Sequence, residues 1–212
     1  SNDSDWAVRE AVAKSLASFA PKTALPLLEK LSNDSESSVR EAAAKALVSF
    51  PPKVALPLLE KLSNDDYYNV RFAVTKSLVN FPSETALPLL EKLSNDSESS
   101  VREAAAKALA NFPSKKAFLL LEKLSTDPSG YVRSAVAQSL ASFPAKKALP
   151  ILKKLSTHSN PYIRLAVAKS LANFPPEIAI PLLEKLSTDS DSDVRLAATK
   201  SLASFPTKTA LP

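Results

Sequence analysis

The 212-residue sequence has no cysteine and a single glycine, and each scarcity excludes a class of site. Without cysteine the chain can form no disulfide framework, no thiolate zinc site and no cysteine nucleophile. One glycine excludes glycine-rich phosphate loops and leaves tight β-hairpins and strand bulges very hard to build. No apolar run approaches the roughly 18 residues of a membrane span, and the N-terminus lacks a signal-peptide pattern. We therefore expect a cytoplasmic protein that has no membrane contact and is not built from sheets.

The residues that are present predict a folded chain. Hydrophobic residues make up 45% and charged residues 23% of the sequence, with a net charge of +5. This composition can bury a substantial core and is unlike that of a disordered segment.

A repeat of 31 residues runs through the whole sequence. The segment LSNDSESSVREAAAKAL occurs at 31–47 and again unchanged at 93–109, which is two repeat lengths later. A Val-Arg pair, once Ile-Arg, marks the same place in each copy: Val8-Arg9, Val39-Arg40, Val70-Arg71, Val101-Arg102, Val132-Arg133, Ile163-Arg164 and Val194-Arg195. A fixed period without insertions indicates a tandem array of one structural unit.

Each unit contains two helical patterns. In the first, counted from Val39, apolar residues recur at offsets 0, 3, 4, 7, 8 and 11. This spacing forms one face of an α-helix, made of Val39, Ala42, Ala43, Ala46, Leu47 and Phe50. The second, at 24–32, places Leu25, Leu28 and Leu31 on one side. A helix tolerates proline in its first turn, so Pro26 leads us to start this second helix near Thr23.

Neither helix can bury its apolar face alone, so neighbouring units must stack. We predict an all-α fold, an α-solenoid or superhelix of two-helix repeats. Residues 1–212 would form one array of about seven repeats. The segment at 207–212 stops inside a unit, and both ends resemble interior repeats, so we expect the array to belong to a longer chain.

The repeat resembles a known family. Pro26, Asp34 and Val39-Arg40 have the spacing of HEAT repeats, and the 31-residue unit is similar to the HEAT-like repeats of phycobilisome lyases. Leu119 and His158 depart from the pattern, where other units have Pro and Asp. The resemblance implies that the helices carrying Val-Arg line a concave, partner-binding face. It also implies an alternative function, a phycobilin-lyase-like chaperone or enzyme.

Aspartate precedes the arginine by six residues in all units but one, and we interpret the two rows as a structural ladder. Carboxylates in the turns and guanidiniums in the following helix can join neighbouring units. The ladder residues are Asp34, Arg40, Asp65, Arg71, Asp96, Arg102, Asp127 and Arg133. A ligand-binding role for the arginines would require their aspartate partners to be absent. His158, the one histidine, is interpreted as a drifted ladder position and not as a catalytic or metal-binding residue.

A row of lysines offers a second interpretation. Lys14, Lys45, Lys76, Lys107, Lys169 and Lys200 share one helical position and could contact a polyanion, as in a nucleic-acid-binding HEAT-like array. However, Glu10, Glu41 and Glu103 stand four residues before three of them, an order that favours ion pairs within the helix. We therefore consider nucleic acid possible but less favoured than a protein partner.

The residues that break the repeat are the candidate binding residues. They lie just before each Val-Arg pair or one residue after it: Trp6, Tyr67, Tyr68, Phe72, Tyr131, Tyr162, Leu165 and Leu196. The core pattern does not require them, and exposed aromatic residues are common anchors of protein interfaces. The alternative is that some pack on neighbouring turns, or that Trp6 and Leu196 cover the ends.

No catalytic pattern is present in the sequence. It has no Ser-His-Asp set, no phosphate loop and no inserted loop to carry a site. The sequence thus predicts a non-catalytic scaffold or sensor segment that binds a protein partner through the concave face. We expect it to need no cofactor or metal and to be monomeric as a fragment.

Overall fold

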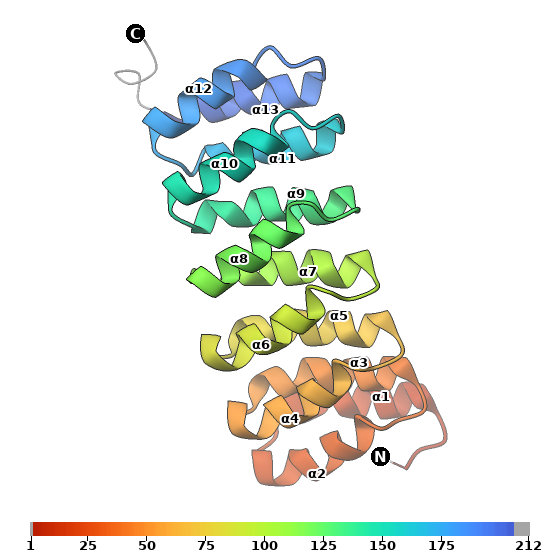
Figure 1. The fold of residues 1–212 in the computed structure, drawn as a ribbon. Coiled ribbons are helices and arrows are strands. Elements are labelled where there is room, and N and C mark those ends of the chain that lie inside the picture. The colour runs from red at the N-terminus through yellow and green to blue at the C-terminus, as the bar shows by residue number, and fades with distance from the viewer. Residues whose placement is uncertain (1, 206–212) are drawn as a thin grey trace. The chain divides into compact units, whose positions relative to one another are not determined.

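The computed structural model describes residues 2–205, and all the regular structure in this range is helical (Figure 1). The chain-end segment 207–212 lies outside the described range. Each repeat consists of one helix that carries the Val-Arg or Ile-Arg pair and a second helix that follows it. The prediction of an all-α solenoid of two-helix repeats is confirmed.

The helices alternate between two kinds. The odd-numbered helices carry the Val-Arg pair, except that Ile-Arg replaces it in α11: α1 (Trp6–Ser15), α3 (Ser37–Ala46), α5 (Tyr68–Ser77), α7 (Ser99–Leu109), α9 (Gly130–Ser139), α11 (Pro161–Leu171) and α13 (Ser192–Ala203). The even-numbered helices carry the leucine pattern: α2 (Pro21–Leu31), α4 (Pro52–Leu62), α6 (Ser83–Leu93), α8 (Lys115–Leu124), α10 (Ala145–Leu155) and α12 (Pro176–Leu186).

The chain divides into two compact units, residues 1–108 and 109–212. In the first unit α1, α3 and α5 lie side by side, and α2, α4 and α6 form a second layer against them (Figure 1). In the second unit α9, α11 and α13 lie side by side, with α10 and α12 in the second layer. The odd helices therefore form a continuous face within each unit.

The core lies between the two layers and is made of the repeated positions. Val39 and Leu47 of α3 and its following turn are fully buried, and so are Leu28 and Leu59 of the even helices. Small alanines such as Ala43 let neighbouring odd helices approach closely. Burial removes roughly 25 cal/mol of unfavourable hydration per Å² of apolar surface, so stacking supplies most of the stability that the single helices lack.

The start of the second helix differs from the prediction. α2 begins at Pro21 and not near Thr23, and the amide of Ala24 already bonds to the carbonyl of Ala20 at 3.1 Å. Pro21 fits the first helical position because its φ is preset and its missing N–H would have no partner there. Pro26 is then the sixth residue, beyond the first turn. It is tolerated because it lies on the exposed side, where water can hydrate the carbonyl that its missing N–H leaves free.

Leu119 shows why one repeat can lack this proline. Its side chain lies on the exposed surface of α8, at the position that Pro26 has in α2. The start of α8 is set by a capping serine, since Ser114 Oγ accepts a hydrogen bond from the amide of Ala117 at 3.2 Å. The start of the helix therefore does not depend on the residue at position 119, which lies beyond the first turn.

Phe50→Ala tests how much burial by neighbouring repeats contributes. Phe50 is 4% exposed, so its removal leaves a cavity and should lower the free energy of unfolding by about 3–5 kcal/mol in urea denaturation. Phe19 occupies the same repeat position but is 52% exposed, so Phe19→Ala should cost far less. Equal losses for the two variants would contradict the stacking argument.

Candidate functional site

The turn that precedes each odd helix is organised by its aspartate. Asp34 Oδ1 accepts a hydrogen bond from the amide of Glu36 at 3.0 Å. Asp65, Asp96 and Asp189 each accept the equivalent bond from the amide two residues later, at 2.9–3.0 Å. These local bonds fix where each carboxylate points, which is a usual role of aspartate in turns.

The same carboxylates receive an arginine from the preceding repeat. Arg40 donates from Nε to Asp65 Oδ2 at 2.6 Å and from Nη2 to Asp65 Oδ1 at 2.9 Å. The pairs Arg9–Asp34, Arg71–Asp96 and Arg164–Asp189 have the same two bonds, at 2.6–2.8 Å. Two parallel bonds match the planar guanidinium to the carboxylate and fix the register of adjacent repeats.

Each arginine also holds the turn of its own repeat. Arg40 Nη1 donates to the carbonyls of Asp34 at 2.6 Å and Ser35 at 3.0 Å. Arg102 Nη1 reaches the carbonyl of Asp96 at 2.7 Å in the same way. Asp127 Oδ1 accepts the amide of Ser129 at 2.8 Å. The guanidinium therefore joins its own turn to the next one wherever both bonds form.

The ladder lowers the pKa of the carboxyl groups of Asp34, Asp96 and Asp189. Hydrogen bonds from Arg9 and from Arg164 lower the pKa of Asp34 and of Asp189. Burial alone would raise the pKa of Asp96, but the bonds from Arg71 and from the amide of Glu98 outweigh it, and the pKa is lowered. These carboxylates are thus held ionised beside the guanidinium of the preceding repeat.

The ladder changes at His158. His158 Nδ1 takes over the local role of the carboxylate and accepts the amide of Asn160 at 3.0 Å. It does not pair with the preceding arginine: Arg133 Nε is buried and has no hydrogen-bond partner among residues 2–205. Arg133 Nη1 still bonds to the carbonyl of Asp127. Burial lowers the pKa of His158, and the charges of Arg133 and Arg164 lower it further, so the ring stays neutral more readily.

The lysine row is partly neutralised. Lys14, Lys45 and Lys107 form ion pairs with Glu10, Glu41 and Glu103 at 2.5–2.8 Å. The ammonium of Lys76 lies 5.4 Å from the centre of the Phe72 ring, a cation–π contact. Lys169 and Lys200 are exposed and have leucines, Leu165 and Leu196, four residues before them.

The carboxylate of Glu41 has a second partner that links two repeats. Asn69 Nδ2 of α5 donates to Glu41 Oε2 of α3 at 2.8 Å. Burial alone would raise the pKa of Glu41, but the bonds from Lys45 and Asn69 more than offset it, so the pKa is lowered. A polar network therefore fills the surface between these two helices.

The candidate binding residues fall into two groups. Trp6, Tyr68 and Leu196 are exposed on odd helices, whereas Phe72 and Leu165 are half-buried. Tyr67 is exposed, but the guanidinium of Arg40 lies over its ring at 5.5 Å, so it also packs on the neighbouring turn. Tyr131 and Tyr162 are the most exposed of the four tyrosines, at 76% and 73%.

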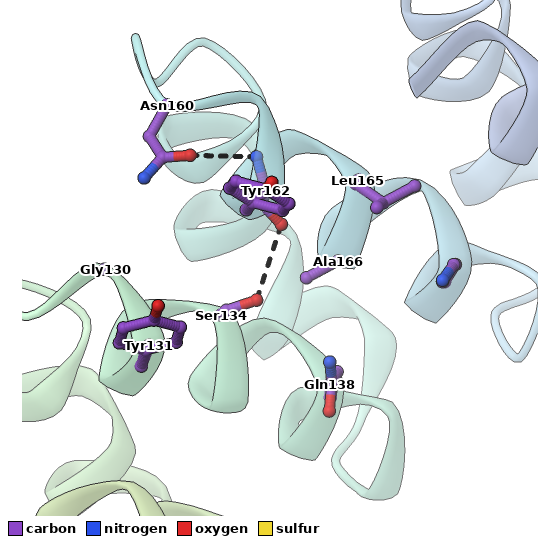
Figure 2. A pocket seen from close by; sticks show the side chains of 9 residues that line it. Gly130, Tyr131, Ser134, Gln138, Asn160, Tyr162, Leu165 and Ala166 are labelled. Carbon is purple, nitrogen blue, oxygen red and sulfur yellow. Dashed lines mark hydrogen bonds between the residues drawn. The ribbon is translucent and has the colours of Figure 1, made fainter. Parts of the chain in front are cut away.

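The structure brings Tyr131, Tyr162 and Leu165 together at one cavity (Figure 2). The cavity has a volume of about 420 Å³ and lies between α9 and α11. Gly130, Tyr131, Ser134 and Gln138 line it from α9, and Asn160, Tyr162, Leu165, Ala166 and Lys169 line it from α11 and its preceding turn. Asn160 Oδ1 accepts the amide of Tyr162 at 2.9 Å, and Ser134 Oγ donates to the Tyr162 carbonyl at 3.4 Å.

Sequence reasoning missed the importance of Arg133, Asn160 and Gly130 here. The sequence does contain a sign of this site. An arginine can bind a ligand only if its aspartate partner is missing, and histidine replaces that aspartate at position 158. The ladder partner stands 25 residues after each arginine, so the missing carboxylate affects Arg133 and not Arg164. That offset could be learned only from the structure.

No metal site or membrane helix is found in the part of the chain that the structure describes. From residue 2 to 205, no three His, Asp or Glu side chains gather as a metal site would require. None of the helices in that range is long and apolar enough to cross a membrane.

Asp96→Asn tests the ladder through pH. A carboxylate with a lowered pKa contributes stability above its unfolded-state pKa of about 3.9, and this contribution is lost as pH falls through the folded-state pKa. We expect Asp96→Asn to cost about 1–3 kcal/mol in the free energy of unfolding at neutral pH and to lose less on acidification than the parent. The exposed Asp66→Asn serves as the control. An unchanged acid profile for Asp96→Asn would contradict the assignment.

His158→Asp should repair the ladder. A carboxylate there can accept both the turn amide and the unpaired Nε of Arg133, which should raise the free energy of unfolding by about 1–2 kcal/mol. Urea denaturation measures the change. Thr157→Asp adds the same charge at the neighbouring exposed position, so an equal gain in this control would show that general electrostatics, and not Arg133, is responsible.

Comparisons with known proteins agree with this architecture. A family model described as HEAT repeats matches residues 1–78, 55–124 and 118–203. None of the curated protein sequences compared with the chain matches it.

Several solved structures are similar in fold. The E. coli protein YibA has a TM-score of 0.67 and 18% identity, covering 95% of this chain and 78% of its own. The complex of CpcE and CpcF of phycocyanin lyase from Nostoc sp. PCC7120 has a TM-score of 0.56 and 21% identity, and the match covers 96% of this chain and 91% of the lyase chain. Computationally designed armadillo repeat proteins for modular peptide recognition have a TM-score of 0.54 and 22% identity, and the match covers 86% of this chain and 100% of the designed chain. The likeness to HEAT-like repeats expected from the sequence is confirmed, and the chain belongs to the HEAT-repeat family.

Proposed function

We propose that the chain is a non-catalytic interaction segment that binds a protein partner on the exposed face of its odd helices. The observation that carries the proposal is the pair of exposed tyrosines, Tyr131 and Tyr162, at the rim of one cavity. Tyrosine rings combine a large apolar area with a polar hydroxyl and lose little conformational entropy on binding, which is why they anchor many interfaces.

The cavity is held by a rigid frame. Tyr162 is in the first turn of α11, and its backbone bonds to Asn160 on one side and Ser134 on the other. The helices behind it are fixed by buried residues such as Val132 and Ile163. A partner that docks here would therefore order few groups of this chain, which lowers the cost of binding.

Repeated positions hold the fold and exposed positions vary, and this difference supports an interaction role. The repeated positions are buried or used in the Asp–Arg ladder, so they are the same in most units. The residue two after each Val or Ile, which we call the V+2 position, varies from Glu41 to Phe72, Ser134 and Leu165. Variation at exposed positions on a constant frame is how repeat proteins acquire different partners.

The alternatives have weaker support. A nucleic-acid array would use the whole lysine row, yet three of its six lysines are already paired with glutamates. An enzyme or lyase-like role would require reactive groups, and His158, the one histidine, is engaged by the amide of Asn160. The fold is similar to that of designed proteins for modular peptide recognition, and this likeness supports a peptide segment as the partner.

A peptide-display selection on the parent protein tests the proposal. We expect enriched peptides whose affinity falls about tenfold or more for Tyr131→Ser with Tyr162→Ser, since truncated anchors typically cost this much. The double variant Tyr68→Ala with Phe72→Ala tests the first unit by the same measurement, the affinity for the enriched peptides. Leu119→Ser, an exposed apolar residue on the even helix α8, is the matched control.

Melting temperatures of the Tyr131→Ser with Tyr162→Ser variant and of Leu119→Ser should stay close to that of the parent, because the substituted side chains are exposed. Failure to enrich any peptide, or undiminished binding to the double tyrosine variant, would reject the proposed face.

A further inference from the structure

The net positive charge of the chain comes from one segment, which includes both walls of the cavity. Residues 128–176 contain seven Lys or Arg and no Asp or Glu. The rest of the sequence carries 20 basic and 22 acidic residues, so this one segment accounts for the whole positive net charge. It contains α9, α10 and α11, and therefore both walls of the cavity.

The corresponding surface between α3 and α5 shows what the second unit lacks. There the V+2 residue is Glu41, whose carboxylate binds Lys45 and Asn69 between the two helices. Between α9 and α11 the V+2 residue is Ser134, and Gln138 replaces the lysine. No carboxylate lines the cavity, so Lys169 faces it without an acidic neighbour in the lining.

Hydrogen-bond donors converge at one edge of this cavity. Gly130, the one glycine in the sequence, begins α9, where the absence of a side chain lets Asn160 and Arg133 approach the backbone closely. A Cβ at Gly130 would lie 3.2 Å from Asn160 Nδ2 and 3.8 Å from Arg133 Nη2. Both groups are hydrogen-bond donors, and Nη2 is the atom that in Arg40 and Arg164 binds the carboxylate of the next repeat, which Arg133 lacks because His158 stands there.

We infer that this cavity binds an acidic segment of a partner protein, with an Asp or Glu carboxylate at the edge of the cavity that Gly130 and Asn160 line. Asn160 and Arg133 hold the carboxylate, Lys169 supplies a second cation along the cavity, and Tyr131 and Tyr162 contact the flanking residues. The inference rests on the proposed function, because it states the chemistry of the partner at the same site.

The geometry favours a carboxylate over a nucleic-acid backbone. At the same repeat position, Arg9, Arg40, Arg71 and Arg164 each bind a carboxylate through two parallel bonds. A cavity of about 420 Å³ accommodates a side chain and its neighbours. A nucleic-acid strand would need a continuous row of free cations, and the glutamate pairs interrupt the lysine row.

Fluorescence anisotropy at low ionic strength tests the inference. The probe is a fluorescein-labelled peptide rich in Glu and Leu, and its comparison is the same peptide with Gln in place of Glu. We expect the Glu peptide to bind roughly tenfold or more tightly than the Gln peptide.

His158→Asp is the decisive variant, because it gives Arg133 a carboxylate from its own chain while leaving the fold intact. We expect it to weaken the Glu peptide roughly tenfold. Lys169→Gln should weaken it less, and Lys76→Gln at the same position in the first unit is the control that should leave it unchanged. A melting temperature at or above that of the parent verifies that His158→Asp is folded.

Equal binding of the Glu and Gln peptides, or full binding by His158→Asp, would overturn the inference. So would a single-stranded oligonucleotide that binds more tightly than the Glu peptide and is insensitive to His158→Asp, which would identify a general polyanion surface. Display-selected peptides that depend on Tyr131 and Tyr162 but are neither acidic nor sensitive to His158→Asp would reject this inference and leave the proposed function standing.

Discussion

Burial of one repeat by the next is the constraint on which the rest of the structure depends. Phe50 is covered where Phe19, at the same position, is exposed, so the apolar face of a unit is dry only when a neighbour lies on it. This requirement dictates the residues at the stacked positions and explains why they scarcely vary. It also leaves the outward positions of the odd helices free of any structural demand, and those positions are where the tyrosines and the cavity are found.

The Asp–Arg ladder adds direction to a contact that apolar burial alone would leave loosely defined. Alanines and leucines could slide by a helical turn at small cost, whereas a bidentate pair such as Arg40 with Asp65 is satisfied in one register. At position 158 the local turn survives because an imidazole nitrogen can accept one amide. The contact between repeats does not survive, because a neutral ring offers no paired oxygens to Arg133. His158 therefore keeps the local fold of the turn and leaves Arg133 without its carboxylate partner.

The sequence predicted the helices well because a strict 31-residue period, repeated seven times, averages out local ambiguity. It placed the start of α2 wrongly because the rule about proline in a first turn was applied to Pro26, when Pro21 was the residue that met it. Exposed aromatic residues were found by their departure from the repeat. The cavity was not, because it depends on Gly130, Asn160 and Lys169, which are distant in sequence and adjacent only once α9 and α11 lie together.

The forward reach of each arginine has a consequence for how such a chain can grow. A unit brings a carboxylate for the arginine before it and an arginine for the carboxylate after it, as Asp65 and Arg71 do. A copied unit inserted where an Asp–Arg pair joins two repeats therefore forms both new pairs without compensating changes elsewhere. The identical segments at 31–47 and 93–109 are what such copying would leave behind. The array can then lengthen at each such pair, while an altered unit, such as the one with His158, marks a distinct position along it.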